Sequence, residues 1–142
     1  MSTELRYEVE IEARPEVVFR HLTERDGLLR WMAVEVEADV RPGGILRWTH
    51  ENGATMVGRF VELDPPTRVV FRYGWEGGLL GLEPESSTVE ITLGSIGDDA
   101  VTRLELVHRD LPPSSAAEHE VGWRHFLGAL AGLLDGEAVR GG

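Results

Sequence analysis

Histidines are the residues of this sequence best suited to chemistry near neutral pH, and it has five of them: His21, His50, His108, His119 and His125. His50 and His108 lie in segments with the alternation of strands, and His119 lies in a segment with helical periodicity. On facing elements these three imidazoles could converge as metal ligands or as proton-transfer groups. The alternative is a histidine at a pocket rim or one hydrogen-bonded in the core. We expect His21 and His125 on the surface, and we predict neither a metal nor a cofactor.

Other catalytic devices receive little support from the sequence. It has no cysteine, which excludes disulfides and thiolate metal sites. It has no Gly-x-Ser-x-Gly elbow, and leucines instead of Lys-Ser or Lys-Thr follow Gly77-Gly78, so that pair is not a phosphate loop. General acid–base catalysis by buried polar groups stays open. The side chains available for it are Tyr73, His50, His108 and Arg103.

Aromatic side chains recur on the segments that would carry such groups: Trp31, Trp48, Phe71, Tyr73, Trp75 and Trp123. Two interpretations are open. The rings form a solid core, or they line an apolar cavity, because wide indoles on a concave sheet pack one another imperfectly. Four tryptophans are many for 142 residues, so we predict a cavity on the order of a few hundred Å³, the usual scale of small-molecule sites.

A long helix over residues 113–134 must position several of these side chains. Pro112-Pro113 breaks the chain before it, and one apolar stripe follows at helical spacing: His119, Trp123, Phe126, Leu130 and Leu133. Gly122 lies at the edge of the stripe, where a missing side chain would permit close approach. Gly128 and Gly132 fall on the outer face.

The remaining chain is predicted to form mostly strands. Alternation indicates strands over residues 5–11, 34–39, 46–51, 55–63, 69–75, 89–93 and 104–108. Pro15 opens a short helix after the first strand, and a second short helix carries Leu28, Leu29, Trp31 and Met32. Turns are predicted at residues 42–44, 52–53 and 97–99. We therefore predict one α+β domain over residues 1–142, in which a twisted antiparallel sheet curls around the final helix.

Charge and hydropathy restrict the partners of this domain. The net charge of −11 would repel phosphate backbones, so nucleic acid and anionic membranes are poor partners. No apolar run approaches the ~20 residues of a membrane span, and residues 1–7 do not resemble a secretory signal. We expect a soluble cytoplasmic protein without membrane insertion.

Several short stretches, taken in order, carry a family resemblance. They are Pro15-Glu16-Val17-Val18-Phe19, Arg41-Pro42-Gly43-Gly44, residues 58–69, Thr102-Arg103-Leu104 and Gly122-Trp123. The chain resembles the SRPBCC superfamily of START and Bet v 1-like domains, and within it the activator of heat shock protein 90 ATPase group. This resemblance implies the helix-grip fold: about seven antiparallel strands around a long C-terminal helix, with two short helices after the first strand. It also implies a hydrophobic cavity beneath that helix.

The function we predict is binding of a small apolar or amphipathic molecule in that cavity. The expected ligand-binding residues are Trp31, Trp48, His50, Phe71, Tyr73, Trp75, His108, His119, Trp123 and Phe126. Two alternatives follow from the resemblance: a cavity enzyme of polyketide cyclase or dehydratase type, and a co-chaperone-like interaction domain with a chaperone partner. The loop over residues 76–86 carries Leu79, Leu80 and Leu82, which suggest a lid over the pocket or a contact in a homodimer.

Overall fold

The computed structural model describes residues 2–97 and 100–141. A curved sheet and one long helix dominate the architecture, and both short helices follow the first strand. The elements in chain order are β1 (Thr3–Ile11), α1 (Pro15–Thr23), α2 (Arg25–Leu28), β2 (Glu35–Ala38), β3 (Ile45–Thr49), β4 (Thr55–Asp64), β5 (Arg68–Tyr73), η1 (Glu76–Gly81), β6 (Ser87–Ile96), β7 (Val101–Leu111), η2 (Pro113–Ser115) and α3 (Ala116–Gly141).

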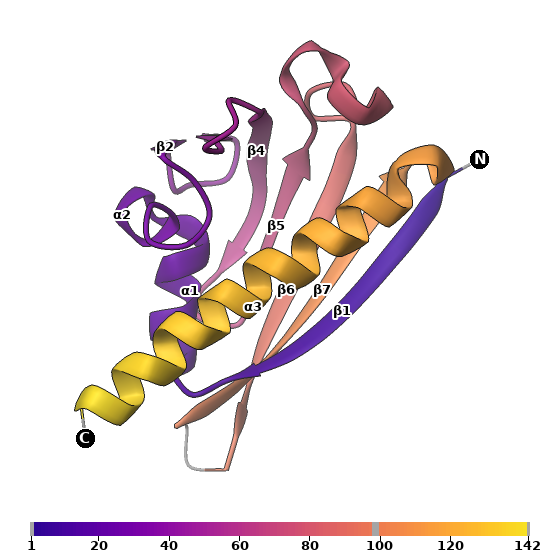
Figure 1. Cartoon of the computed structure of the whole chain (residues 1–142). Coiled ribbons are helices and arrows are strands. Elements are labelled where there is room, and N and C mark those ends of the chain that lie inside the picture. The colour runs from indigo at the N-terminus through magenta and orange to yellow at the C-terminus, as the bar shows by residue number, and fades with distance from the viewer. Residues whose placement is uncertain (1, 98–99, 142) are drawn as a thin grey trace.

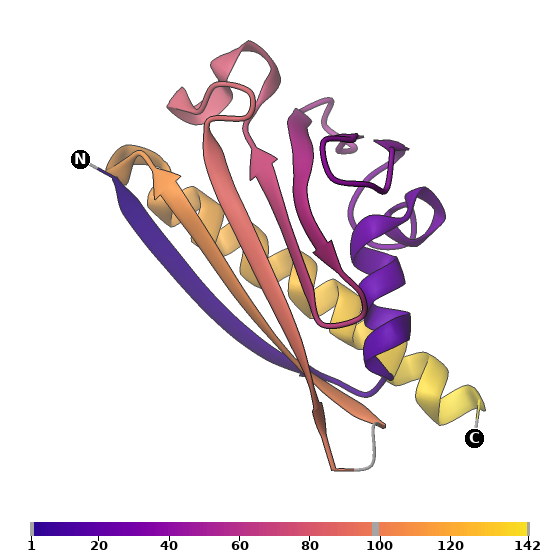
Figure 2. The same cartoon turned by 180° about the vertical axis from the view of Figure 1, so that it is seen from behind.

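Within the described residues the sheet has seven strands, all paired antiparallel, in the order β1-β7-β6-β5-β4-β3-β2. Helix α3 lies diagonally across one face of this sheet, while α1 and α2 stand at the end near β2 (Figure 1). The view from behind shows the strands bending around α3 (Figure 2). The predicted α+β helix-grip fold is confirmed.

Sequence alternation explains why the strands present one face to the helix. In β1 the half-buried side chains of Leu5, Tyr7 and Val9 alternate with exposed glutamate and arginine. In β5, Val69 and Phe71 point into the core, and the arginines on either side of them point away. The sheet therefore buries one face and solvates the other, as antiparallel sheets commonly do.

The turns behave as predicted where the structure describes them. Gly53, with φ of 89°, closes the β3–β4 hairpin. Gly43, with φ of 83°, lies in the turn before β3. Gly97 follows β6 with φ of 71°, but Asp98 and Asp99 of the predicted turn lie outside the described residues.

The second short helix differs from the prediction. Helix α2 ends at Leu28, and Leu29, Trp31 and Met32 lie in the turn that follows it. The physical reason is close packing on α1. A Cβ at Gly27 would stand 2.5 Å from the Arg20 carbonyl oxygen, so glycine lets α2 approach α1. The Trp31 indole then donates to the His21 carbonyl oxygen at 2.8 Å, which holds the turn against α1.

Helix α3 confirms the predicted stripe and is longer than expected. A short 3-10 turn occupies Pro113–Ser115, and the α-helix runs over Ala116–Gly141. It buries His119, Trp123, Leu127, Leu130, Ala131 and Leu134, and Phe126 and Leu133 of the predicted stripe are partly buried beside them. The additional turns are anchored to the rest of the protein: Asp135 accepts a hydrogen bond from the Glu12 backbone N–H, and Glu137 pairs with Arg30.

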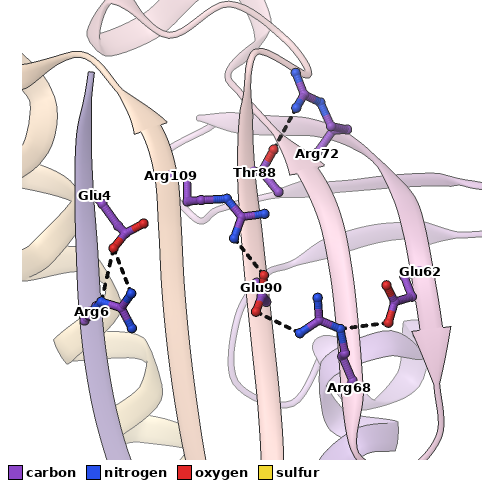
Figure 3. A network of polar contacts seen from close by, with 8 residues as sticks. All are labelled: Glu4, Arg6, Glu62, Arg68, Arg72, Thr88, Glu90 and Arg109. Atoms are coloured by element: carbon purple, nitrogen blue, oxygen red, sulfur yellow. Dashed lines mark hydrogen bonds and ion pairs between the residues drawn. The ribbon is translucent and has the colours of Figure 1, made fainter. Parts of the chain in front are cut away.

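The sheet face opposite the core carries a row of ion pairs across four strands (Figure 3). Arg68 on β5 contacts Glu62 on β4 and Glu90 on β6, each at 2.7 Å. Arg109 on β7 contacts the second oxygen of Glu90 at 2.7 Å. Hydrogen bonds from Arg68, and then from Arg109, hold the pKa of Glu90 at about 2.

We predict that Glu90→Gln lowers the free energy of unfolding by about 1 kcal/mol at pH 7, because the row is partly exposed and screened by solvent. A carboxylate with a lowered folded-state pKa stabilises the fold above its ordinary pKa of 4.5, and this contribution is lost as the pH falls toward 2. Urea unfolding should therefore show a smaller difference between variant and wild type at pH 3 than at pH 7. Glu105→Gln, at an exposed position on β7, is the matched control.

Candidate functional site

Three tryptophans donate their indole N–H groups to three histidines in the space between sheet and helix. Trp48 donates to Nε2 of His50 at 3.1 Å, on the same face of the β3 end. Trp75 donates to Nε2 of His119 at 3.1 Å, and Trp123 to Nδ1 of His108 at 3.0 Å. An indole nitrogen only donates, so each contacted imidazole nitrogen is an unprotonated acceptor.

These contacts fix the protonation of His108. Its Nδ1 accepts from Trp123, so in the neutral ring Nε2 carries the hydrogen and donates to Ser87 Oγ at 2.8 Å. Ser87 donates onward to the Tyr73 carbonyl oxygen at 2.8 Å. Burial, and to a lesser extent the nearby His119, lower the pKa of His108 to about 3. His108 is therefore a neutral structural group at physiological pH.

His119 and His50 are held in the same neutral form. His119 Nδ1 donates to the Ser115 carbonyl oxygen one turn earlier at 2.8 Å, which leaves Nε2 to accept from Trp75. Burial lowers the pKa of His119 and, to the same effect, the pKa of His50. The polar atoms of these rings face indoles and backbone, so the rings present apolar surface to the space around them.

Tyr73, the last residue of β5, lies at the centre of this aromatic cluster. Its ring packs edge-on against His108 at 4.5 Å between centroids and against Trp75 at 5.6 Å, and it tilts against Trp123 at 5.9 Å. Burial raises the pKa of Tyr73, so the phenol is neutral. Its side chain is only 5% exposed, and its hydroxyl makes no hydrogen bond within the described residues.

A cavity of about 70 Å³ lies between α3 and these rings. Its lining is mostly aromatic, with a glycine of α3 on one side: Met32, Trp48, His50, Tyr73, Trp75, Leu80, Glu118, His119, Gly122, Trp123 and Phe126. A Cβ placed on Gly122 would meet no atom within 4 Å. Gly122 therefore leaves room for the cavity, whereas the sequence had suggested a close approach of another element.

A wider groove of about 600 Å³ adjoins the cavity and shares Met32, His50, Trp75, Leu80 and Phe126 with it. The groove runs between the turn after α2, the β3–β4 hairpin, η1 and α3. Its further lining residues are Leu29, Arg30, Trp31, Ala33, Val34, Glu51, Asn52, Ala54, Leu79 and His125. Cavity and groove together form a funnel with a narrow inner end.

The segment η1 builds one rim of this funnel. Gly74 precedes it, and a Cβ there would stand 1.8 Å from the Glu83 carbonyl oxygen, so only glycine lets the loop fold back. The backbone N–H of Trp75 donates to the Leu82 carbonyl oxygen and closes the loop. Leu79 and Leu80 are exposed at the rim, but Leu82 is buried in the core. Leu80 has a positive φ of 58°, an unfavourable conformation for leucine.

Seven of the ten predicted site residues line the cavity: Trp48, His50, Tyr73, Trp75, His119, Trp123 and Phe126. Trp31 lines the groove but not the cavity. Phe71 and His108 lie behind the cavity wall, in the core. The sequence did not indicate Met32 or Glu118 as lining residues. Helical spacing could have found Glu118, which precedes His119 by one position and Gly122 by four.

Three sequence expectations need correction. The cavity between α3 and the sheet has about 70 Å³ and not a few hundred, because the aromatic rings fill most of the gap. His21 is buried, since Arg30 donates to its Nε2 at 2.8 Å and its Nδ1 donates to the Val17 carbonyl oxygen. Arg103 is half exposed and pairs with Glu8 and Glu10, so it cannot serve a buried acid–base site.

Metal binding by His50, His108 and His119 receives no support from the geometry. Among residues 2–97 and 100–141, no three His, Cys, Asp or Glu side chains are grouped as a metal site would require. One nitrogen of each of these rings also accepts an indole hydrogen, which occupies a lone pair that a metal would need.

Sequence comparison agrees with this architecture. The family model of the activator of Hsp90 ATPase homolog 1-like proteins matches residues 12–135, most of the chain. The chain belongs to this family. No curated protein matches the sequence.

Solved structures similar to this family member share its helix-grip fold. Protein MLL2253 from Mesorhizobium loti has a TM-score of 0.79 at 18% identity, with 94% of this chain and 97% of that chain covered. The Aha1 dimer from Colwellia psychrerythraea has a TM-score of 0.75 at 20% identity, with 94% and 96% covered. CalU16 from Micromonospora echinospora has a TM-score of 0.74 at 27% identity, with 98% and 80% covered. The SRPBCC resemblance seen in the sequence is thereby confirmed.

Throughout the described part of this family member, every helix falls short of the combined length and hydropathy that a bilayer crossing requires.

Proposed function

We propose that this member of the activator of Hsp90 ATPase homolog 1-like family binds a small hydrophobic or amphipathic molecule in the funnel formed by cavity and groove. The observation that carries the proposal is the unfilled space beside Gly122, which seven aromatic or imidazole rings line. Ligand sites are typically concave, mostly apolar and provided with few polar groups. The inner cavity of this funnel has all three properties.

Binding is favoured over catalysis by the state of the buried histidines. A general base needs an available lone pair and a pKa near the operating pH. His108 and His119 instead have lowered pKa values, and both of their ring nitrogens are hydrogen-bonded. These two imidazoles are thus engaged in holding Trp75 and Trp123. A homodimer, a chaperone partner and a cytoplasmic location stay predictions, and the dimeric Aha1 neighbour supports the first of them.

Filling the cavity from α3 tests the proposal. Gly122→Leu places an apolar side chain in the open space, and we expect at least tenfold weaker binding of the neutral fluorescent probe N-phenyl-1-naphthylamine. Replacing a helical glycine by leucine should also raise the free energy of unfolding by up to about 1 kcal/mol, so lost binding would not reflect unfolding. Probe fluorescence and urea unfolding measure the two effects.

Gly128→Leu is the matched control, because Gly128 lies exposed on the same helix and a Cβ there also meets no atom within 4 Å. It should gain stability to a similar degree and bind the probe like the wild type. Wild-type affinity in Gly122→Leu, or no saturable binding by the wild type, would contradict the proposed site.

A further inference from the structure

We infer that the ligand enters the cavity with an uncharged end carrying a hydroxyl or carbonyl group, which hydrogen-bonds to the Tyr73 hydroxyl. This inference rests on the proposed function and names the chemical class of its ligand: a neutral amphipathic molecule with a small polar tip. Free carboxylates such as fatty acids are disfavoured.

The Tyr73 hydroxyl is a hydrogen-bonding group that the protein leaves unused. Every fully buried side-chain nitrogen and oxygen among the described residues has a hydrogen-bond partner. The Tyr73 hydroxyl has none, so it still touches open space, although the residue is more than nine-tenths buried. Tyr73 lines the cavity between α3 and the sheet but not the adjoining groove. The hydroxyl is therefore available to a molecule in that cavity.

The indole N–H groups around the cavity are already engaged. The indole N–H groups of Trp48, Trp75 and Trp123 all donate to imidazoles. A largely buried hydroxyl that has no partner in the protein is left to hydrogen-bond to a ligand atom that accepts or donates. Tyr73 is thus the group that would orient a ligand in the cavity.

The charges around the cavity disfavour an anionic ligand. No arginine lines the cavity, and the sequence contains no lysine. Glu118, exposed at the end of the lining set nearest solvent, is the charged residue among the lining side chains. The net charge of the chain is −11. A carboxylate or phosphate would therefore enter without a cationic partner and against a negative field, which is strongly unfavourable in an apolar cavity.

The volumes of cavity and groove limit which part of the ligand each can hold. A cavity of about 70 Å³ has room for only a few water molecules, so only a small tip of a ligand fits inside. The adjoining groove, at about 600 Å³, has room for the larger apolar body. The Arg30 guanidinium on the groove wall is already bound to Glu137 and His21, so it does not supply a free cation there either.

Competition against N-phenyl-1-naphthylamine tests this inference with three ligands of equal chain length: octan-1-ol, octan-2-one and octanoate, at pH 7.5. We expect the alcohol and the ketone to displace the probe at least tenfold better than octanoate. Tyr73→Phe should weaken the alcohol and the ketone about three- to tenfold, the range expected for one hydrogen bond, and should leave octanoate unchanged. Tyr7→Phe on β1, the other tyrosine of the sequence, is the matched control and should change nothing.

Stability supplies a second readout. Because the Tyr73 hydroxyl has no partner inside the protein, Tyr73→Phe should unfold in urea at the same concentration as the wild type or at a higher one. A lower midpoint would mean that the hydroxyl already has an internal partner, and would overturn the inference. Octanoate binding as well as octanol, or an unchanged alcohol affinity in Tyr73→Phe, would overturn it while leaving the Gly122→Leu result intact. Failure of the probe to bind the wild type would instead reject the proposed function itself.

Discussion

Acidification from pH 6.5 to pH 4 should lower the free energy of unfolding by at least about 3 kcal/mol, chiefly through His108. Its pKa is about 3 in the folded protein and 6.5 ordinarily, so between these values the unfolded chain binds a proton that the folded one rejects. Its contribution is complete above pH 6.5, and about 1.4 kcal/mol is lost for each pH unit as the pH falls toward 3. Burial also lowers the pKa values of His21, His50 and His119, which act in the same direction. Urea unfolding at pH 7, 5.5 and 4 measures the effect.

Variants separate His108 from the other titrating groups. His108→Gln has no proton to gain, and its amide can accept from Trp123 and donate to Ser87, so its pH profile should be flatter than that of the wild type. His125→Gln removes an exposed imidazole on α3 and should follow the wild-type profile. If His108→Gln does not fold, NMR of the wild type decides, because the His108 ring signals should not titrate between pH 8 and pH 4. A midpoint in that range would contradict the neutral, buried assignment.

Truncation of Trp123 should produce the second large effect. The side chain is 5% exposed, packs against Tyr73 and donates to His108. Removing a buried aromatic ring commonly lowers the free energy of unfolding by about 3–5 kcal/mol, and the unpaired Nδ1 of His108 adds about 1–3 kcal/mol. We therefore expect Trp123→Ala to lose at least about 4 kcal/mol in urea unfolding.

Trp123→Phe keeps an aromatic ring but removes the N–H donor, so it should lose only about 1–3 kcal/mol. The difference between the two variants measures packing, and the loss in the phenylalanine variant measures the contact with His108. A loss below about 1 kcal/mol for Trp123→Ala would mean that the ring lines open space without being packed, contrary to its observed burial.

Periodicity predicted the fold well because burial on one face leaves a pattern that survives in any single sequence. The alternation in β1, the Asn52-Gly53 turn and the stripe from His119 to Leu130 each depend on neighbours close in the chain. Element ends were less accurate. Strand β7 covers Val101–Leu111 where residues 104–108 were predicted, since backbone pairing with β1 and β6 continues beyond the apolar core.

The candidate site was predictable only in part, because its contacts depend on the register between distant elements. Trp48 and His50 are two positions apart on one strand face, so their proximity could be inferred. Trp75 and His119 are 44 positions apart and meet only when η1 and α3 take their places. His21 was expected on the surface, but the turn carrying Arg30 and Trp31 covers it. The volume left between packed rings depends on rotamers, which no sequence pattern encodes.

The first strand of the sheet is synthesised first and is paired last. In β1, Thr3 pairs with Leu111 and Ile11 with Thr102, so its partner strand emerges from the ribosome only after roughly 100 more residues, some 5–20 s later at ordinary synthesis rates. Until then Leu5, Tyr7 and Val9 have neither a neighbouring strand nor α3 to cover them. Such long-range pairing slows folding. The sheet is therefore expected to close only after translation of β7, with the nascent N-terminal strand waiting as an unpaired, partly apolar segment.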